Sequence, residues 1–135
     1  MMKKIDVIVE YSDSNMSAYI EGAPIVVVGK NLGEIEKNTK EAIDLYLESC
    51  KDMSIKPVEI LDGELELSFK IDAATFINYY SGIFTKSALS RITGINERQL
   101  WHYAAGIHKP RQKQLEKIQN GIKGLTQELR AISLV

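Results

Sequence analysis

The side chains of this chain that could do chemistry lie mostly between positions 85 and 111. Three consecutive polar residues, Glu97, Arg98 and Gln99, carry groups that recognise base edges in a double helix. Arginine can donate two hydrogen bonds to guanine, glutamine can pair with adenine, and glutamate can accept a hydrogen bond from cytosine. These residue types in one short segment therefore predict contacts with DNA bases.

Two short helices are expected to position these side chains. In the segment TKSALSRITGINERQLWHYAAGIHKP, Thr85 can cap a helix that stops at Gly94, where glycine permits a left-handed conformation. Asn96 can cap a second helix, with Gln99 at the position that completes a capping box, and Gly106 ends it. Two such helices joined by about three residues are typical of a helix-turn-helix, in which the first helix presents the second.

The predicted DNA-binding surface combines the outward residues of the second helix with polar residues on either side. Its members are Thr85, Lys86, Ser87, Asn96, Glu97, Arg98, Gln99, Trp101, His102, Lys109 and Arg111. The outer members of this set would hold phosphates through charge and through N–H groups at a helix start. Alternatives stay open, because Trp101 could cover the groove between the helices and His102 could be a surface or capping residue. The charges at the helix start could also be ordinary solvated ones.

Two further helices are expected to flank this pair. Asp72 can cap the first, which carries Phe76 and Ile77 at helical spacing and ends near Gly82. Pro110 precedes the last, where its missing N–H costs nothing.

The last helix carries a possible assembly surface. Its apolar residues are spaced by three and four, at Leu115, Ile118, Ile122, Leu125, Leu129 and Ile132. Glycine at positions 121 and 124 argues against a long, self-standing coiled coil, at ~1 kcal/mol each. We expect the first part of this stripe to pack on its own domain and the last turns to help form a homodimer or higher oligomer, which would match a palindromic operator.

The first half of the chain is predicted to combine a small antiparallel sheet with one helix. Strands are expected at 3–12, 16–22 and 24–28, followed by a helix over 32–48 that Asn31 and Glu34 can cap. Residues 57–60 and 64–71 could form a hairpin about the turn at Asp62 and Gly63. The fold class is therefore α+β, with a small sheet domain over 1–71 and an all-α domain over 72–135.

Acidic side chains are the only candidates for catalysis in this first half. Converging carboxylates among Asp6, Glu10, Asp13, Glu64 and Glu66 could hold magnesium for nuclease chemistry. Alternating acidic residues are, however, also typical of a solvated sheet face, which is the interpretation we favour. We therefore expect no enzyme activity, no cofactor and no metal.

Composition and charge bound the remaining possibilities. The chain has 135 residues, of which 44% are hydrophobic and 26% charged, as in a folded soluble protein. No apolar run is long enough to span a membrane, and the start MMKK does not resemble a signal peptide, so we expect a cytoplasmic protein. Cys50 is the only cysteine and is expected to be a packed, inert thiol.

The charge is unevenly divided between the two halves. Residues 1–71 have 8 basic and 14 acidic side chains, a net charge of −6, whereas residues 72–135 have 9 and 4, a net charge of +5. A basic half favours polyanions such as nucleic acid, and an acidic half favours basic proteins or water. The split suggests two modules with different partners.

The segment from Thr85 to Pro110 resembles the lambda-repressor-like (XRE) helix-turn-helix. The resemblance rests on the small Ala88, the turn at Gly94, the apolar Ile95 and Leu100, and the closure from Gly106 to Pro110. It implies that the residues matching Lys86, Glu97, Arg98 and Gln99 approach DNA, usually from a dimer on a palindromic operator.

The whole chain is similar to HicB-type antitoxins of bacterial toxin–antitoxin pairs, in which an acidic β-β-β-α-β module precedes such a domain. The segment NLGEIEKNTKEAIDLYLE resembles the helix that follows the third strand in that family. The resemblance implies a partial, inactive ribonuclease H-like module that blocks a small basic RNA-cleaving HicA-like toxin, and a second domain that represses the pair's own promoter. Two alternatives remain: a stand-alone repressor whose first domain binds a small molecule or only dimerises, and a nuclease that needs Asp6 or Glu66.

Overall fold

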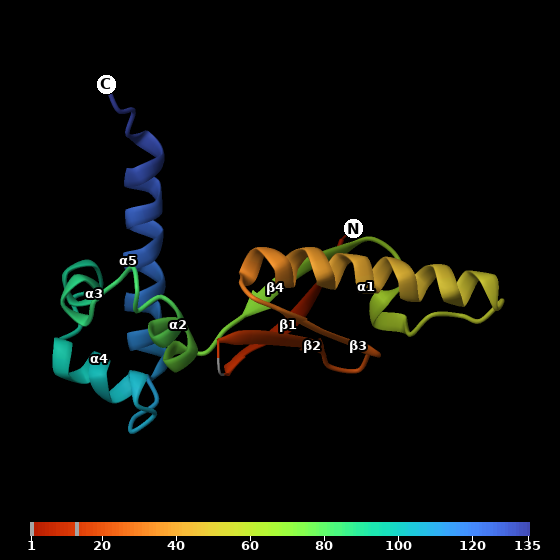
Figure 1. Cartoon of the computed structure of the whole chain (residues 1–135), viewed down its shortest axis with the longest axis horizontal. Coiled ribbons are helices and arrows are strands. Elements are labelled where there is room, and N and C mark those ends of the chain that lie inside the picture. The colour runs from red at the N-terminus through yellow and green to blue at the C-terminus, as the bar shows by residue number, and fades with distance from the viewer. Residues whose placement is uncertain (1, 13) are drawn as a thin grey trace. The chain divides into compact units, whose positions relative to one another are not determined.

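The structure is a computed structural model that describes residues 2–12 and 14–135. The chain divides into two compact units, Met1–Ile71 and Asp72–Val135. The first unit contains a four-stranded sheet and one long helix, and the second contains four helices (Figure 1). Among the described residues, none of the helices combines the length and the apolar character needed to cross a membrane.

The first three strands form the antiparallel meander that the sequence predicts. They are β1 (Lys3–Ser12), β2 (Asn15–Ile20) and β3 (Ile25–Gly29). Val9 lies opposite Ala18, which in turn lies opposite Val27, and all three side chains are buried. Because side chains alternate between the faces of a strand, this row defines the face that packs against the helix.

The predicted hairpin at the end of this unit is wrong, and the sheet is mixed rather than antiparallel. Residues Glu59–Leu61 form a single 3-10 turn that buries Leu61, and only β4 (Leu65–Lys70) is a strand. β4 pairs with β1 in parallel, in the order β3-β2-β1-β4. The helix between β3 and β4 returns the chain to the end of the sheet where β1 begins, so β4 must run in the same direction as β1.

The long helix of this unit, α1 (Leu32–Asp52), lies along one face of the sheet (Figure 1). Asn31 caps it as predicted, since its Oδ1 accepts from Glu34 N at 2.9 Å. The helix ends at Asp52 rather than at Glu48. Its last turn buries Cys50, whose thiol is free and packed as expected, and this burial favours the extra turn.

The second unit is a small helical bundle. Its helices are α2 (Ala73–Tyr79), α3 (Lys86–Thr93), α4 (Glu97–Ala104) and α5 (Gln112–Ala131). One apolar core joins all four helices, and its buried members are Ala73, Ile77, Leu89, Ile95, Leu100, Tyr103 and Ile118. Asp72 caps α2 as predicted, accepting from Thr75 N at 2.7 Å. The helix ends at Tyr79, earlier than expected.

The stripe on α5 is only partly used within the unit. Ile118 is buried and Ile122 packs against the core, whereas Leu115 is exposed. Leu129, in the last turn of α5, is also exposed, and so is Ile132, which follows the helix in an extended conformation instead of continuing the predicted stripe. The first part of α5 therefore packs on its own domain, as predicted, and its last turns have no cover within the unit.

Candidate nucleic-acid interface

The two short helices α3 and α4 are connected by residues 94–96, as the sequence predicts. Gly94 has φ of 76°, a left-handed conformation that costs glycine nothing, and its N–H donates to Ser90 O. Ile95 is buried, and its N–H donates to Thr93 Oγ1 at 3.2 Å. The turn is therefore held by both a backbone stop and a buried apolar anchor.

Both helices have the predicted N-caps. Thr85 Oγ1 accepts from Ala88 N at 3.0 Å, and Asn96 Oδ1 accepts from Gln99 N at 2.8 Å. The reciprocal bond of a capping box, in which Asn96 N would donate to Gln99 Oε1, is not formed among the described residues. The cap alone leaves other N–H groups at the start of α4 without intrahelical partners, where they can face a phosphate.

The inner face of α4 is closely packed, and its outer face is open. Leu100 is completely buried and Tyr103 nearly so, whereas Glu97 and Arg98 are exposed. Neither exposed side chain forms an ion pair within residues 2–12 and 14–135. A guanidinium group at the start of an exposed helix, without a carboxylate partner in the described part of the chain, is available to pair with a base or a phosphate.

Lys86 and Trp101 form one surface across α3 and α4. The Lys86 Nζ lies 4.2 Å from the centroid of the Trp101 ring, and this ring is 56% exposed. The contact holds the ammonium group in place through the negative face of the indole. The sequence gives no signal for this pair, because the contact depends on how the two helices cross.

His102 is less open than the predicted interface requires. Its ring packs edge-to-face against His108 with centroids 4.8 Å apart, and its Nδ1 is buried without a partner among the described residues. Its carbonyl accepts from Ile107 N at 3.0 Å. His102 therefore supports the loop after α4, and its neighbour His108 is a contact that the sequence does not indicate.

The remaining predicted residues lie at the ends of these helices. Ser87 is exposed in the first turn of α3, and Gln99 is half-buried. Lys109 and Arg111 are exposed beyond α4, and Arg111 is the N-cap residue of α5, without a side-chain capping bond.

Two residues outside the predicted set position the pair of helices. Asn78 Nδ2 donates to Ala104 O at 2.9 Å, which satisfies a carbonyl at the end of α4 and links it to α2. Gly121 of α5 lies directly against the backbone of α3 at Ile92. Sequence spacing indicates neither contact, since both depend on packing between helices far apart in the chain.

The carboxylates of the first unit do not converge. Asp6 and Glu10 lie four residues apart on the same open face of β1, and thus about 13 Å apart. Glu66 lies opposite Lys4 on that face. Asp13 falls outside the described residues. Within the part of the chain that the structure describes, no three His, Cys, Asp or Glu side chains could share a metal ion.

Comparisons of the chain with protein-family models, with curated proteins and with solved structures give no significant match.

Proposed function

We propose that residues 72–135 form a helix-turn-helix domain that binds double-stranded operator DNA, with α4 in the major groove. The observation that carries this proposal is the contrast between the two faces of α4. Leu100 and Tyr103 anchor the helix in the core, while Arg98 stands exposed at its first turn with no acidic partner in the described chain. A short helix held in this way has its outer face free for base contacts.

Cations around α4 supply the contacts to the DNA backbone. Lys86 is held over Trp101, and Lys109 and Arg111 are exposed beyond the other end of α4. The capped start of α3 at Thr85 adds N–H groups that suit a phosphate. Such contacts fix the position of a protein on the duplex, while the residues at the start of α4 select the sequence.

The exposed C-terminal end of α5 provides a surface through which two copies of the chain can form a symmetric dimer. Leu129, which is 57% exposed, belongs to the helical stripe whose earlier members pack on the core, and Ile132, which is 54% exposed, follows directly after the helix. Pairing these turns between two chains gives a homodimer with the two-fold symmetry of a palindromic operator.

The first unit acts on a protein partner in this proposal. The resemblance to HicB-type antitoxins and the net charge of −6 over residues 1–71 support a small basic, RNA-cleaving HicA-like toxin as that partner. The chain then neutralises the toxin with its first domain, which is a partial ribonuclease H-like fold without activity, and represses their shared promoter with its second.

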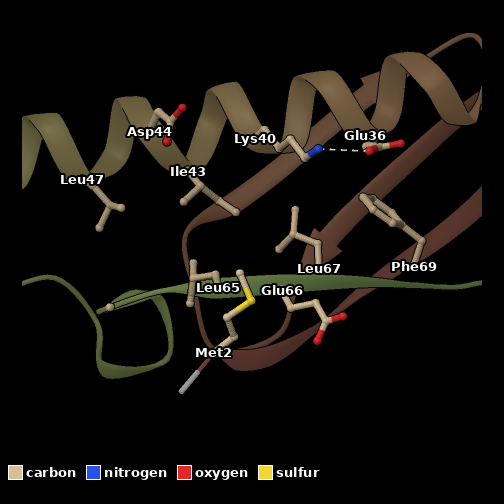
Figure 2. A pocket seen from close by; sticks show the side chains of 11 residues that line it. Met2, Glu36, Lys40, Ile43, Asp44, Leu47, Leu65, Glu66, Leu67 and Phe69 are labelled. Carbon is tan, nitrogen blue, oxygen red and sulfur yellow. Dashed lines mark hydrogen bonds and ion pairs between the residues drawn. The ribbon is translucent and has the colours of Figure 1, made fainter.

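A stand-alone repressor is the second candidate, and one observation favours it. A cavity of about 590 Å³ lies between α1 and β4 in the first unit (Figure 2). This volume falls within the range of about 300–1,000 Å³ that is common for small-molecule sites. The two candidates differ in whether the first unit holds a protein or a small ligand.

Native purification of the full-length chain from its own host separates these candidates. We expect a stoichiometric small basic protein to be retained at moderate salt and to be inactive on RNA until it is released. A chain that is purified alone, yet binds the DNA upstream of its own gene, would leave the stand-alone repressor. If Arg98→Ala and Lys86→Ala both keep this DNA binding, the proposed interface is contradicted.

A further inference from the structure

The helix of the first unit leaves one side of the sheet partly uncovered. α1 packs mainly against β3, and no comparable packing joins it to β4. The resulting groove lies between α1 and β4, and its apolar lining is Met2, Ile43, Leu47, Leu65, Leu67 and Phe69 (Figure 2). The three β4 residues are only half-buried, although they lie on the face that the helix covers elsewhere. We call this feature the β4 groove.

The same three β4 residues leave their backbone groups unpaired. Lys3 N donates to Glu64 O at 2.9 Å, and Lys3 lies opposite Leu65 in the parallel register. In a parallel ladder with this register, every second residue of β4 directs its N–H and C=O groups toward β1, and the residues between them direct these groups away from the sheet. Leu65, Leu67 and Phe69 are the outward set. No other group within residues 2–12 and 14–135 bonds to them.

The opposite edge of the sheet is protected. On β3, Val28 O accepts from Asn38 Nδ2 of α1 at 2.8 Å, and the helix packs closely against this strand. Proteins usually cover or block an edge strand, because its free backbone groups are a template for another chain. The β3 edge is thus bonded to α1 at Val28, whereas no such bond reaches the outer edge of β4 among the described residues, and the β4 edge borders an apolar groove.

The charges beside the groove are mainly negative. Glu36 and Asp44 of α1 line it, against one lysine, Lys40, whereas Glu66 borders the groove from β4 but belongs to the opposite face of the sheet (Figure 2). Lys40 Nζ is paired with Glu36 at 3.0 Å, so Asp44 on α1 has no cationic neighbour at ion-pair distance among the described residues. A ligand for this site must therefore combine apolar side chains, free backbone groups and positive charge.

We propose that the β4 groove binds an extended, basic segment of a partner protein, which pairs with the outer edge of β4 as a fifth strand. Alternate apolar side chains of this segment fill the space between Leu67 and Ile43, and its lysine or arginine side chains reach Asp44. The backbone pairing supplies affinity, and the pocket with its carboxylate supplies selectivity. This inference rests on the proposed role of the first unit as a protein-binding domain, and it names the surface and the chemistry of the partner.

Charge favours a basic partner over a second copy of this chain. Two copies pairing through β4 would bring together units that each have a net charge of −6. Like charges across an interface disfavour association, whereas opposite charges speed encounter and select partners.

The test uses the isotope-labelled full-length chain and three short acetylated peptides as probes. The first alternates lysine with valine, the second alternates glutamate with valine, and the third is the lysine peptide with alternate backbone nitrogens methylated. We expect the lysine peptide to slow amide hydrogen exchange at Leu65, Leu67 and Phe69. The glutamate peptide should bind at least about tenfold more weakly, and the methylated peptide should not bind, because its N–H groups are blocked.

Three variants locate the binding. Asp44→Lys reverses the exposed charge beside the groove, and Glu41→Lys makes the same kind of change on the same helix at an exposed position that does not line it. We expect the first to weaken the lysine peptide by about tenfold and the second by less than about twofold. Because both positions are exposed, neither change should unfold the unit. Leu67→Asp, checked for folding by its amide spectrum, should abolish binding.

Several outcomes would overturn the inference. They are equal binding of the acidic and basic peptides, no binding of any peptide, protection at β3 instead of β4, and equal effects of the two lysine variants. Slower amide exchange at the β4 residues when the concentration of the chain alone is raised, without any peptide, would indicate a second copy as the occupant. If a basic protein is retained from the host equally by Leu67→Asp, the antitoxin function stands and the β4 groove is not its site.

Discussion

Gly121 is the residue at which the packing of the DNA-binding unit can be tested most directly. It lies where α5 crosses α3, and a β-carbon built there would be 2.9 Å from the carbonyl carbon of Ile92 and 3.2 Å from Cα of Thr93. Both neighbours are backbone atoms, so no side-chain rotation can relieve the overlap. Gly121→Ala must therefore push α3 away from α5, against the packing that holds Leu89 in the core.

Gly124, one turn further on, is the matched control. A β-carbon at that position meets nothing within 4 Å. Alanine in a helix interior is favoured over glycine by ~1 kcal/mol, so Gly124→Ala should stabilise the unit by up to that amount. At Gly121 the same gain is offset by overpacking, which costs ~1–3 kcal/mol and more against rigid backbone. We expect a net loss of about 1–2 kcal/mol, and thus a difference of ~2–3 kcal/mol between the two variants.

Unfolding in urea, followed by tryptophan fluorescence, measures this difference. Trp101 is the only tryptophan in the chain and belongs to the second unit, so the signal reports that unit even when the two units unfold separately. The midpoint should fall for Gly121→Ala and rise for Gly124→Ala. If both variants stabilise the unit alike, α3 and α5 do not approach each other closely at Gly121.

Three further predictions concern DNA binding, assembly and pH. Arg98→Ala should weaken operator binding by about 1–3 kcal/mol and relax specificity, whereas Lys86→Ala should weaken all sequences and flatten the salt dependence; equal loss of sequence preference in electrophoretic titrations would contradict these roles. Leu129→Lys should shift sedimentation from dimer toward monomer without lowering the unfolding midpoint of the unit, because this side chain is exposed. Burial, with Tyr79 adjacent, raises the pKa of Tyr80 above its ordinary value of about 10. As the pH rises, the unfolded chain therefore loses the Tyr80 proton before the folded chain does. The free energy of unfolding, measured by urea titration at several pH values, should keep this contribution below pH 10 and fall above it, and Tyr80→Phe should reduce the fall.

Local signals in the sequence were enough to place the ends of several helices. Asp72, Thr85 and Asn96 each accept the expected hydrogen bond from the N–H three residues later, and Gly94 adopts the expected left-handed conformation. These features depend on a few adjacent residues and on the limited conformations open to them, so they can be predicted without knowing the rest of the fold.

The last strand shows where such signals stop. Residues 57–60 and 64–71 have the apolar pattern of a hairpin, and the pattern alone cannot distinguish a neighbouring partner from a distant one. In the structure, Val58 N donates to Tyr46 Oη at 2.9 Å and Leu61 is buried, so the first segment packs as a turn near α1. β4 pairs instead with β1, far away in the sequence.

In the candidate interface, too, some features could be predicted from the sequence and others could not. Residue types and spacing predicted that Glu97, Arg98 and Trp101 of α4 face outward, because a helix repeats with a fixed period, whereas Gln99 and His102 are half-buried. The pairing of Lys86 with Trp101 and of His102 with His108 could not be predicted, since each depends on how separate segments approach one another. Gly121 illustrates the point most clearly: in the sequence it only weakens a helix, whereas in the fold it is the position where two helices touch.

Local patterns therefore predicted all five helices, the first three strands, several N-caps and the exposed start of α4, because these follow from backbone geometry and neighbouring side chains. The strand at the open edge of the sheet, the position of the β4 groove and the close approach of α3 to α5 could be known from the folded chain alone. These features arise from contacts between segments far apart in the chain, whose energies depend on packing in three dimensions rather than on local pattern.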